Sequence, residues 1–124
     1  MGRRNFLGYR FRKNITIPKG SLMIHVIAIL TAKPGHRGAV LEAFHANMPA
    51  VHAEDGCIEY APATDTPDAG PIQAALGEDS FMVIEKWASL DALKAHAASP
   101  HMAAYGEKTR DLLASRVIHV LSPA

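Results

Sequence analysis

Four side chains in the second half of the chain are of types from which a small-molecule site could be built. Glu85 and Trp87 alternate on one face of an apolar strand, and His96 and His101 follow on two short helices. An imidazole titrates near neutral pH and therefore suits a general base, while an indole offers a face for stacking. An acid on an apolar strand face needs a partner, so we expect Glu85 either to line a pocket or to pair with a cation such as Arg116.

The same residues also have purely structural explanations. Trp87 belongs to a type that often fills the core, and both histidines have a structural alternative in helix capping or the surface. His96 and His101 nevertheless lie on either side of the Ser99-Pro100 break, which would allow both rings to face one cleft. We therefore interpret these two histidines as candidate catalytic residues and keep the structural alternative open.

The elements that must position these residues follow the order β-α-β-β-α-β. The run from Met23 to Thr31 is apolar on both alternating faces, which is typical of a strand buried on both sides. Ser89 and Ser99 are expected N-caps of two consecutive helices, with Pro100 in the first turn of the second. Strands are expected over residues 23–31, 57–61, 81–88 and 116–121, and the first helix over residues 36–54. This order predicts an α+β, ferredoxin-like domain with its helices on one face of an antiparallel sheet.

Apolar residues on both faces of the strands predict self-association. Helices can cover only one face of such a sheet, so the alternate apolar side chains would face water in a monomer. Leaving several of them wet forgoes roughly several kcal/mol at ~25 cal/mol per Å² of apolar surface. A second copy packed sheet to sheet removes that surface, and we therefore expect a homodimer.

The distribution of charge divides the chain into a basic segment and an acidic body. Six of the thirteen Lys and Arg residues lie within residues 1–22, which contain no acid, so seven basic and twelve acidic residues give the remainder a net charge of −5. We interpret residues 1–22 as a basic tail that is disordered or precedes the true start at Met23, with targeting or binding to an anionic surface as the alternative. Residues 23–124 are expected to form one domain. An acidic body without a basic stripe argues against nucleic acid as a partner.

Other classes of protein are excluded by what the sequence lacks. No apolar run approaches the ~20 residues that span a bilayer. The single Cys57 excludes an internal disulfide and predicts a reducing, cytoplasmic location. The chain has no H-E-x-x-H or C-x-x-C, and the five-residue spacing of His96 and His101 does not stack two ligands on a helix, so no metal site is expected. No P-loop or G-x-S-x-G motif occurs either.

Four blocks of sequence occur in order from Met23 onward: M-I-H-V-I-A, E-D-G-C-I-E-Y-A-P-A-T-D, V-I-E-K-W-A-S and H-A-A-S-P-H-M-A-A-Y. Together they resemble the antibiotic biosynthesis monooxygenase family, particularly its small quinol monooxygenase branch. The resemblance implies a homodimeric α/β barrel that oxygenates quinols or related electron-rich aromatics with O₂, without flavin, haem or metal. It points to His96 and His101 as catalytic candidates, and to a substrate-binding set of Trp87, Glu85, Asn47 and Tyr105.

Two alternatives remain open beside this activity. A sister branch of the family degrades haem with an Asn on the first strand, a Trp on the third and a His on the following helix. Trp87 and His96 match that pattern, but Ala28 stands where the Asn is expected. The other alternative is a non-catalytic dimeric α/β-barrel protein that only binds small molecules.

Overall fold

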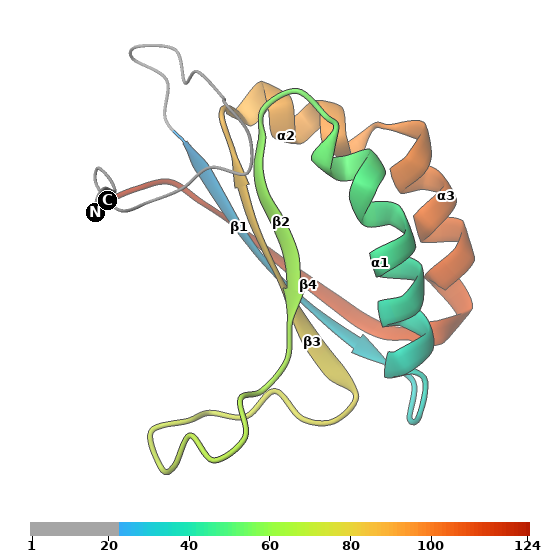
Figure 1. Cartoon of the computed structure of the whole chain (residues 1–124), viewed down its shortest axis with the longest axis vertical. Helices are drawn as coiled ribbons and strands as arrows, with labels where there is room; N and C mark the ends of the chain where they lie inside the picture. The colour runs from blue at the N-terminus through green and yellow to red at the C-terminus, as the bar shows by residue number, and fades with distance from the viewer. Residues whose placement is uncertain (1–22) are drawn as a thin grey trace.

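The computed structural model describes residues 23–124, so the interpretation of residues 1–22 as a tail lies outside the described residues. Its elements are β1 (Ile24–Ala32), α1 (Arg37–His52), β2 (Cys57–Ala63), β3 (Ser80–Trp87), α2 (Leu90–Ala97), α3 (Pro100–Thr109), a 3₁₀ helix (Arg110–Leu112) and β4 (Leu113–Leu121). The strands form one antiparallel sheet in the order β2-β3-β1-β4 (Figure 1). This arrangement confirms the predicted α+β, ferredoxin-like order, with two short helices between β3 and β4.

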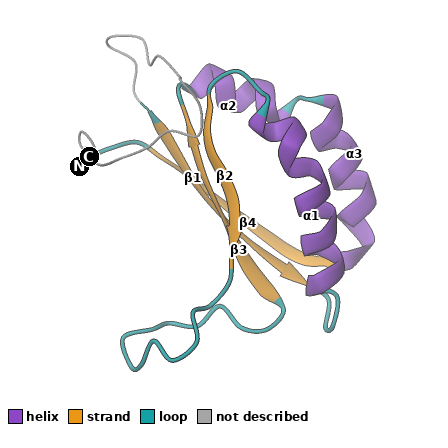
Figure 2. Cartoon of the chain, viewed as in Figure 1, coloured by secondary structure: helices purple, strands orange, loops and turns teal. Residues whose placement is uncertain are grey.

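The three α-helices all lie against the same face of the sheet (Figure 2). Neighbouring side chains of a strand point to opposite faces, so the helices cover every second residue of β1 and β3, whereas β4 stays largely exposed. The covered residues of β1 are at most 7% exposed and are Ile24, Val26, Ala28, Leu30 and Ala32. Glu85 pairs in register with Val26, and Trp87 pairs with Ile24, so the predicted acid and indole lie on this covered face.

Aromatic packing attaches α1 to the sheet. Phe44, on the buried stripe of α1, stacks on Tyr60 of β2 with ring centroids 4.9 Å apart. The same ring meets Phe81 of β3 edge-on at 6.0 Å and Tyr105 of α3 at 6.1 Å. Because aromatic contacts of this kind add to the burial of apolar area, Phe44 joins α1, α3 and two strands in one core.

The two predicted N-caps are present and hold the helical segment that carries the histidines. Ser89 Oγ accepts a hydrogen bond from Ala92 N at 3.1 Å, and Ser99 Oγ accepts one from Met102 N at 3.4 Å. Ser99 also donates to the carbonyl of His96 at 2.8 Å, which fixes the end of α2 against the start of α3. These caps satisfy backbone donors that a helix start leaves unpaired, so the short helices begin where the sequence predicts.

A tight approach at Gly56 brings the end of α1 beside α2. Gly56 has φ +82°, and a Cβ atom there would lie only 2.6 Å from Cβ of Ala92. Its carbonyl accepts a hydrogen bond from Ala88 N at 2.8 Å. Only glycine combines this left-handed conformation with such close contact. The residues just before Gly56 are therefore held next to α2.

The uncovered face of the sheet carries a second set of apolar side chains. Ile29 pairs with Met82 of β3 and with Val117 of β4, and Ile27 pairs with Ile84, so these residues form one continuous surface. Val117 is 48% exposed on that face. Within residues 23–124 no helix is long and apolar enough to cross a membrane.

Candidate active site

A cavity of about 710 Å³ lies between the covered face of the sheet and the helices α2 and α3. Its sheet side is mostly apolar, with Val26, Ala28, Leu30 and Val83 among the lining residues. The polar and charged residues that line it are Tyr60, Glu85, Lys94, His96, Tyr105, Thr109, Arg110 and Arg116. A largely apolar cavity of this size with a few polar groups is typical of a small-molecule site.

Glu85 lines the cavity as a buried acid whose partner is the neighbouring indole. Nε1 of Trp87 donates a hydrogen bond of 2.9 Å to Glu85 Oε1, and Glu85 is only 7% exposed. Burial raises the pKa of Glu85 to about 7, although the Trp87 hydrogen bond acts in the opposite direction, and the charge of Glu54 adds to the increase. Within residues 23–124, Glu85 makes no ion pair with Arg116. The carboxyl group can therefore exchange a proton near neutral pH.

Trp87 supports the site from behind and does not face the cavity. It is fully buried, and its ring lies against His96 with centroids 4.6 Å apart at a tilt of 37°. Tyr60 meets His96 from another side, at 5.3 Å and 63°. His96 and Glu85 line the cavity and Trp87 does not, so the stacking of the indole on a substrate ring stays a prediction. The indole fixes the positions of these two groups.

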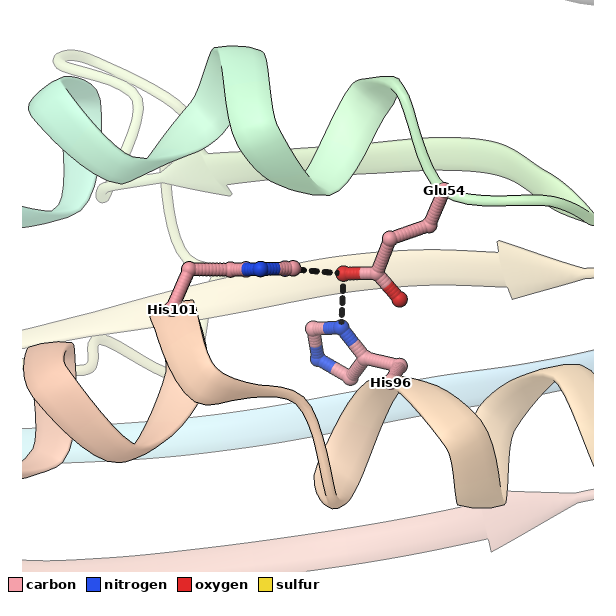
Figure 3. Close-up of side chains that lie close together, drawn as sticks. All are labelled: Glu54, His96 and His101. Carbon is pink, nitrogen blue, oxygen red and sulfur yellow. Dashed lines mark hydrogen bonds and ion pairs between the residues drawn. The ribbon is translucent and has the colours of Figure 1, made fainter.

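Glu54 joins the two candidate histidines through a single carboxylate oxygen (Figure 3). Its Oε2 lies 2.9 Å from Nδ1 of His96 and 2.6 Å from Nε2 of His101. An ionised carboxylate has no proton to donate, so both imidazoles donate to it. Because the hydrogen at Nδ1 is used in this way, Nε2 of a neutral His96 is the ring nitrogen left to accept a proton.

The three residues of this cluster differ in their access to solvent. The side chain of His96 is 5% exposed, that of Glu54 13%, and that of His101 28%. His96 lines the cavity, whereas Glu54 and His101 do not. The structure therefore brings the two predicted histidines together, but only His96 reaches the cavity, and His101 lies on the solvent side of Glu54.

The same cluster has a composition that suits a divalent metal ion. The ligand atoms of Glu54, His96 and His101 all lie within 4.8 Å of one another. Two imidazoles and one carboxylate are a ligand set used for transition metals. The two short hydrogen bonds to Glu54 give a second explanation of the same geometry, and chelation experiments distinguish the two.

The remaining predicted site residues divide between the cavity and its surroundings. Tyr105 lines the cavity, and its buried Oη has no hydrogen-bond partner within the described part of the chain. Burial raises the pKa of Tyr105 to about 12, although the positive charge of Arg116 acts in the opposite direction. Asn47 is not among the residues that line the cavity, and its Nδ2 donates to Sδ of Met102 at 3.3 Å. Its role in substrate binding stays a prediction.

The sequence did not predict that Glu54 contacts both histidines, or that Tyr60 and Arg116 line the cavity. Glu54 follows the end of α1, where the negative end of the helix dipole disfavours an acid. That misplaced charge was a signal in the sequence that Glu54 needs donors elsewhere in the fold. The alternation of β4 places Arg116 on the same face as Ile118, but nothing local shows that this face borders a cavity.

The fold defines a ferredoxin-like α+β protein with a cavity between its sheet and helices. Residues 23–108 match the antibiotic biosynthesis monooxygenase family, and the chain therefore belongs to this family. The "probable quinol monooxygenase YgiN" of Escherichia coli is 40% identical over 103 residues, which cover 82% of this chain and 98% of that protein. The protein is thus a monooxygenase by family.

Solved structures agree with this assignment at the level of the fold. The crystal structure of PA3566 from Pseudomonas aeruginosa is 28% identical, with a TM-score of 0.69 over 84% of this chain and 96% of that chain. Rv0793 from Mycobacterium tuberculosis is 27% identical, with a TM-score of 0.67 over 82% of this chain and 95% of that chain. Both likenesses extend over nearly the whole of the other protein.

Proposed function

We propose that this protein is a cofactor-independent monooxygenase that oxidises a quinol or a related electron-rich aromatic with O₂. The observation that carries the proposal is the buried His96, which lines an apolar cavity while Glu54 holds its Nδ1. A quinol that loses a proton becomes electron-rich enough to pass an electron to O₂ directly. The protein then needs to bind the ring, accept the proton and exclude water.

The overall reaction balances without any external reductant. A hydroquinone and one O₂ give a hydroxyquinone and one water, so one oxygen atom enters a ring C–H bond and the other leaves as water. The four electrons that O₂ accepts all come from the quinol. This balance is compatible with a site built only from side chains.

His96 is the proposed general base. Its Nε2 accepts the phenolic proton, and the quinolate then transfers one electron to O₂. The two radicals recombine to form a peroxide on the ring carbon. The proton held on His96 returns to the distal peroxide oxygen, which leaves as water when the O–O bond breaks and the ring C–H proton is lost. Removal of a general base typically lowers the rate by ~10² to 10⁴.

Glu54 and His101 support His96 in this proposal. A carboxylate that accepts a hydrogen bond from Nδ1 fixes the tautomer of the ring and stabilises the imidazolium that forms during the reaction. His101 donates to the same oxygen and is the more exposed of the two histidines. The chain His96–Glu54–His101 therefore links the buried base to the solvent.

Glu85 and the indole behind it complete the acidic end of the cavity. With a pKa of about 7, the carboxyl group of Glu85 is partly protonated near neutral pH and can donate a hydrogen bond to an oxygen of the substrate. The indole N–H of Trp87 holds this group in place at 2.9 Å. Glu85 is therefore proposed as a substrate-binding residue, and Trp87 as a residue that positions it.

We further propose that two copies of the chain pack through their uncovered sheet faces as a dimeric α/β barrel. The continuous apolar surface around Ile27, Ile29 and Ile84 supports this assembly, because its burial removes apolar area from water. The covered face with the cavity is not needed for that contact. Each protomer therefore keeps its own cavity.

Oxygen uptake by chelator-treated protein across a panel of quinols tests the proposal. Uptake above spontaneous autoxidation supports a metal-free monooxygenase, and uptake that requires added metal would instead assign a metal to the Glu54 cluster. Binding without uptake on any quinol would favour the non-catalytic binding protein. Degradation of haem has less support, because Ala28 lines the cavity and offers no amide group there.

A further inference from the structure

The cavity is polarised along β1, with acidic and cationic groups at opposite ends. Glu85 pairs in register with Val26, and Arg116 pairs with Leu30, on the other side of the same strand. Four residues of a strand span about 13 Å. Glu85 and His96 therefore mark one end of the cavity, and Arg116 marks the other.

The cationic end holds two groups with no hydrogen-bond or ion-pair partner among the described residues. Arg116 is exposed and forms no ion pair with an acid there, and Oη of Tyr105 is buried without any hydrogen bond. The guanidinium is close enough for its charge to influence the phenol. Leaving a buried hydroxyl unpaired is costly, so a ligand or a water must satisfy it.

The other cation near this end is already engaged. Nη1 of Arg110 lies 2.7 Å from Oε1 of Glu107, and its Nε lies 4.0 Å from Asp111. Arg116 therefore differs from Arg110 in having its guanidinium free for a ligand. The fork of a guanidinium matches the two oxygens of a carboxylate, and a phenol O–H adds a further donor.

We propose that Arg116 and Tyr105 form an anion-binding subsite that takes the carboxylate of a hydroxylated aromatic acid. The acid extends from this subsite toward His96, where its phenolic ring meets the proposed base. The two ends are about 13 Å apart along the strand, which is longer than a single aromatic ring. The oxidation of this acid rests on the proposed function. Its binding at the subsite does not, because binding needs no reaction.

Calorimetric titration under argon tests the subsite without turnover. The probes are a hydroxynaphthoate and the matched neutral naphthol, which differ in the carboxylate alone. The wild type is expected to bind the acid about ten-fold more tightly or better, as one charge-assisted contact provides. Arg116→Gln removes this preference and leaves naphthol binding unchanged, and Tyr105→Phe reduces it by a smaller factor. Arg110→Gln is the matched control and keeps the preference.

Three results would overturn the subsite. The first is equal affinity of the wild type for both probes. The second is an equal loss of affinity for both probes in Arg116→Gln. The third is an Arg110→Gln variant that loses the preference for the acid as fully as Arg116→Gln does. Circular dichroism checks that each variant is folded. Selective binding of the acid by a protein that oxidises no quinol would keep the subsite and reject the proposed function, so the two failures are distinguishable.

Discussion

The indole Nε1 of Trp87 donates a hydrogen bond of 2.9 Å to the carboxyl group of Glu85, two residues earlier on the same strand face. Both residues are nearly inaccessible to solvent. A lone donor offsets only part of the cost of burying the charge, so the pKa of Glu85 stays raised at about 7. Strand alternation thus places an acid with a near-neutral pKa against the wall of the cavity.

The stability of the protein should depend on pH through Glu85. Its folded pKa of about 7 exceeds the ordinary value of 4.5, so its contribution is fully present below pH 4.5 and is lost as pH rises through 7. The total loss is about 3 kcal/mol, at about 1.4 kcal/mol for each pH unit between the two values. Glu85→Gln should remove this component. Urea unfolding of both proteins at about pH 5 and about pH 8 measures it, and equal pH dependence in the two would contradict the assignment.

Glu54→Gln should slow turnover strongly while substrate binding changes little. The amide oxygen is neutral and accepts hydrogen bonds from the two imidazoles more weakly, so the tautomer of His96 is no longer firmly fixed. We expect a loss of kcat on the order of 10²-fold, comparable to loss of the base. Glu42→Gln, an exposed acid on α1, is the matched control and should behave like the wild type. A pH–rate profile for Glu54→Gln identical to that of the wild type would show that Glu54 has only a structural role.

The protein should sediment at about twice the 13.4 kDa of one chain at micromolar concentration. Val117→Asp places a charge on the uncovered sheet face and should shift the protein toward the monomer. Leu90→Asp is the matched control, because Leu90 is 45% exposed and lies on the helix side, against 48% for Val117. A wild type that is monomeric and stably folded would contradict packing through the sheets.

Deletion of residues 1–22 should leave folding and dimerisation intact. This segment is basic, contains no acid and shows no periodic apolar pattern, so it offers little for a core. Thermal unfolding of the truncated and full-length proteins makes the comparison. A fall in the midpoint by many degrees would show instead that the segment packs against the domain or its partner.

The sequence predicted the elements well because their signals are local. The alternation of β1, the caps Ser89 and Ser99, and the position of Gly56 each depend on residues close together in the chain. Glu85 and His96 could be predicted as neighbours for the same reason, since a strand and a short capped helix connect them.

The rest of the site depends on contacts between distant segments. Glu54 and His101 are 47 residues apart, and their 2.6 Å contact exists only because Gly56 holds the end of α1 beside α2. Whether Trp87 faces the cavity or supports it was equally beyond the sequence, because both alternatives place it on the same strand face. In the structure the indole packs against His96, and His96 lines the cavity while Trp87 does not.

Reaction of the chelator-treated protein with a quinol under isotopically labelled O₂ measures whether His96 drives a metal-free oxygenation. We expect a hydroxyquinone that carries one labelled oxygen atom and labelled water as the other product. His96→Ala should lose the labelled hydroxyquinone while it keeps the fold. Autoxidation gives unlabelled quinone and hydrogen peroxide, which serve as the blank. A wild type that yields no labelled hydroxyquinone above this blank, or a His96→Ala variant as active as the wild type, would contradict the account.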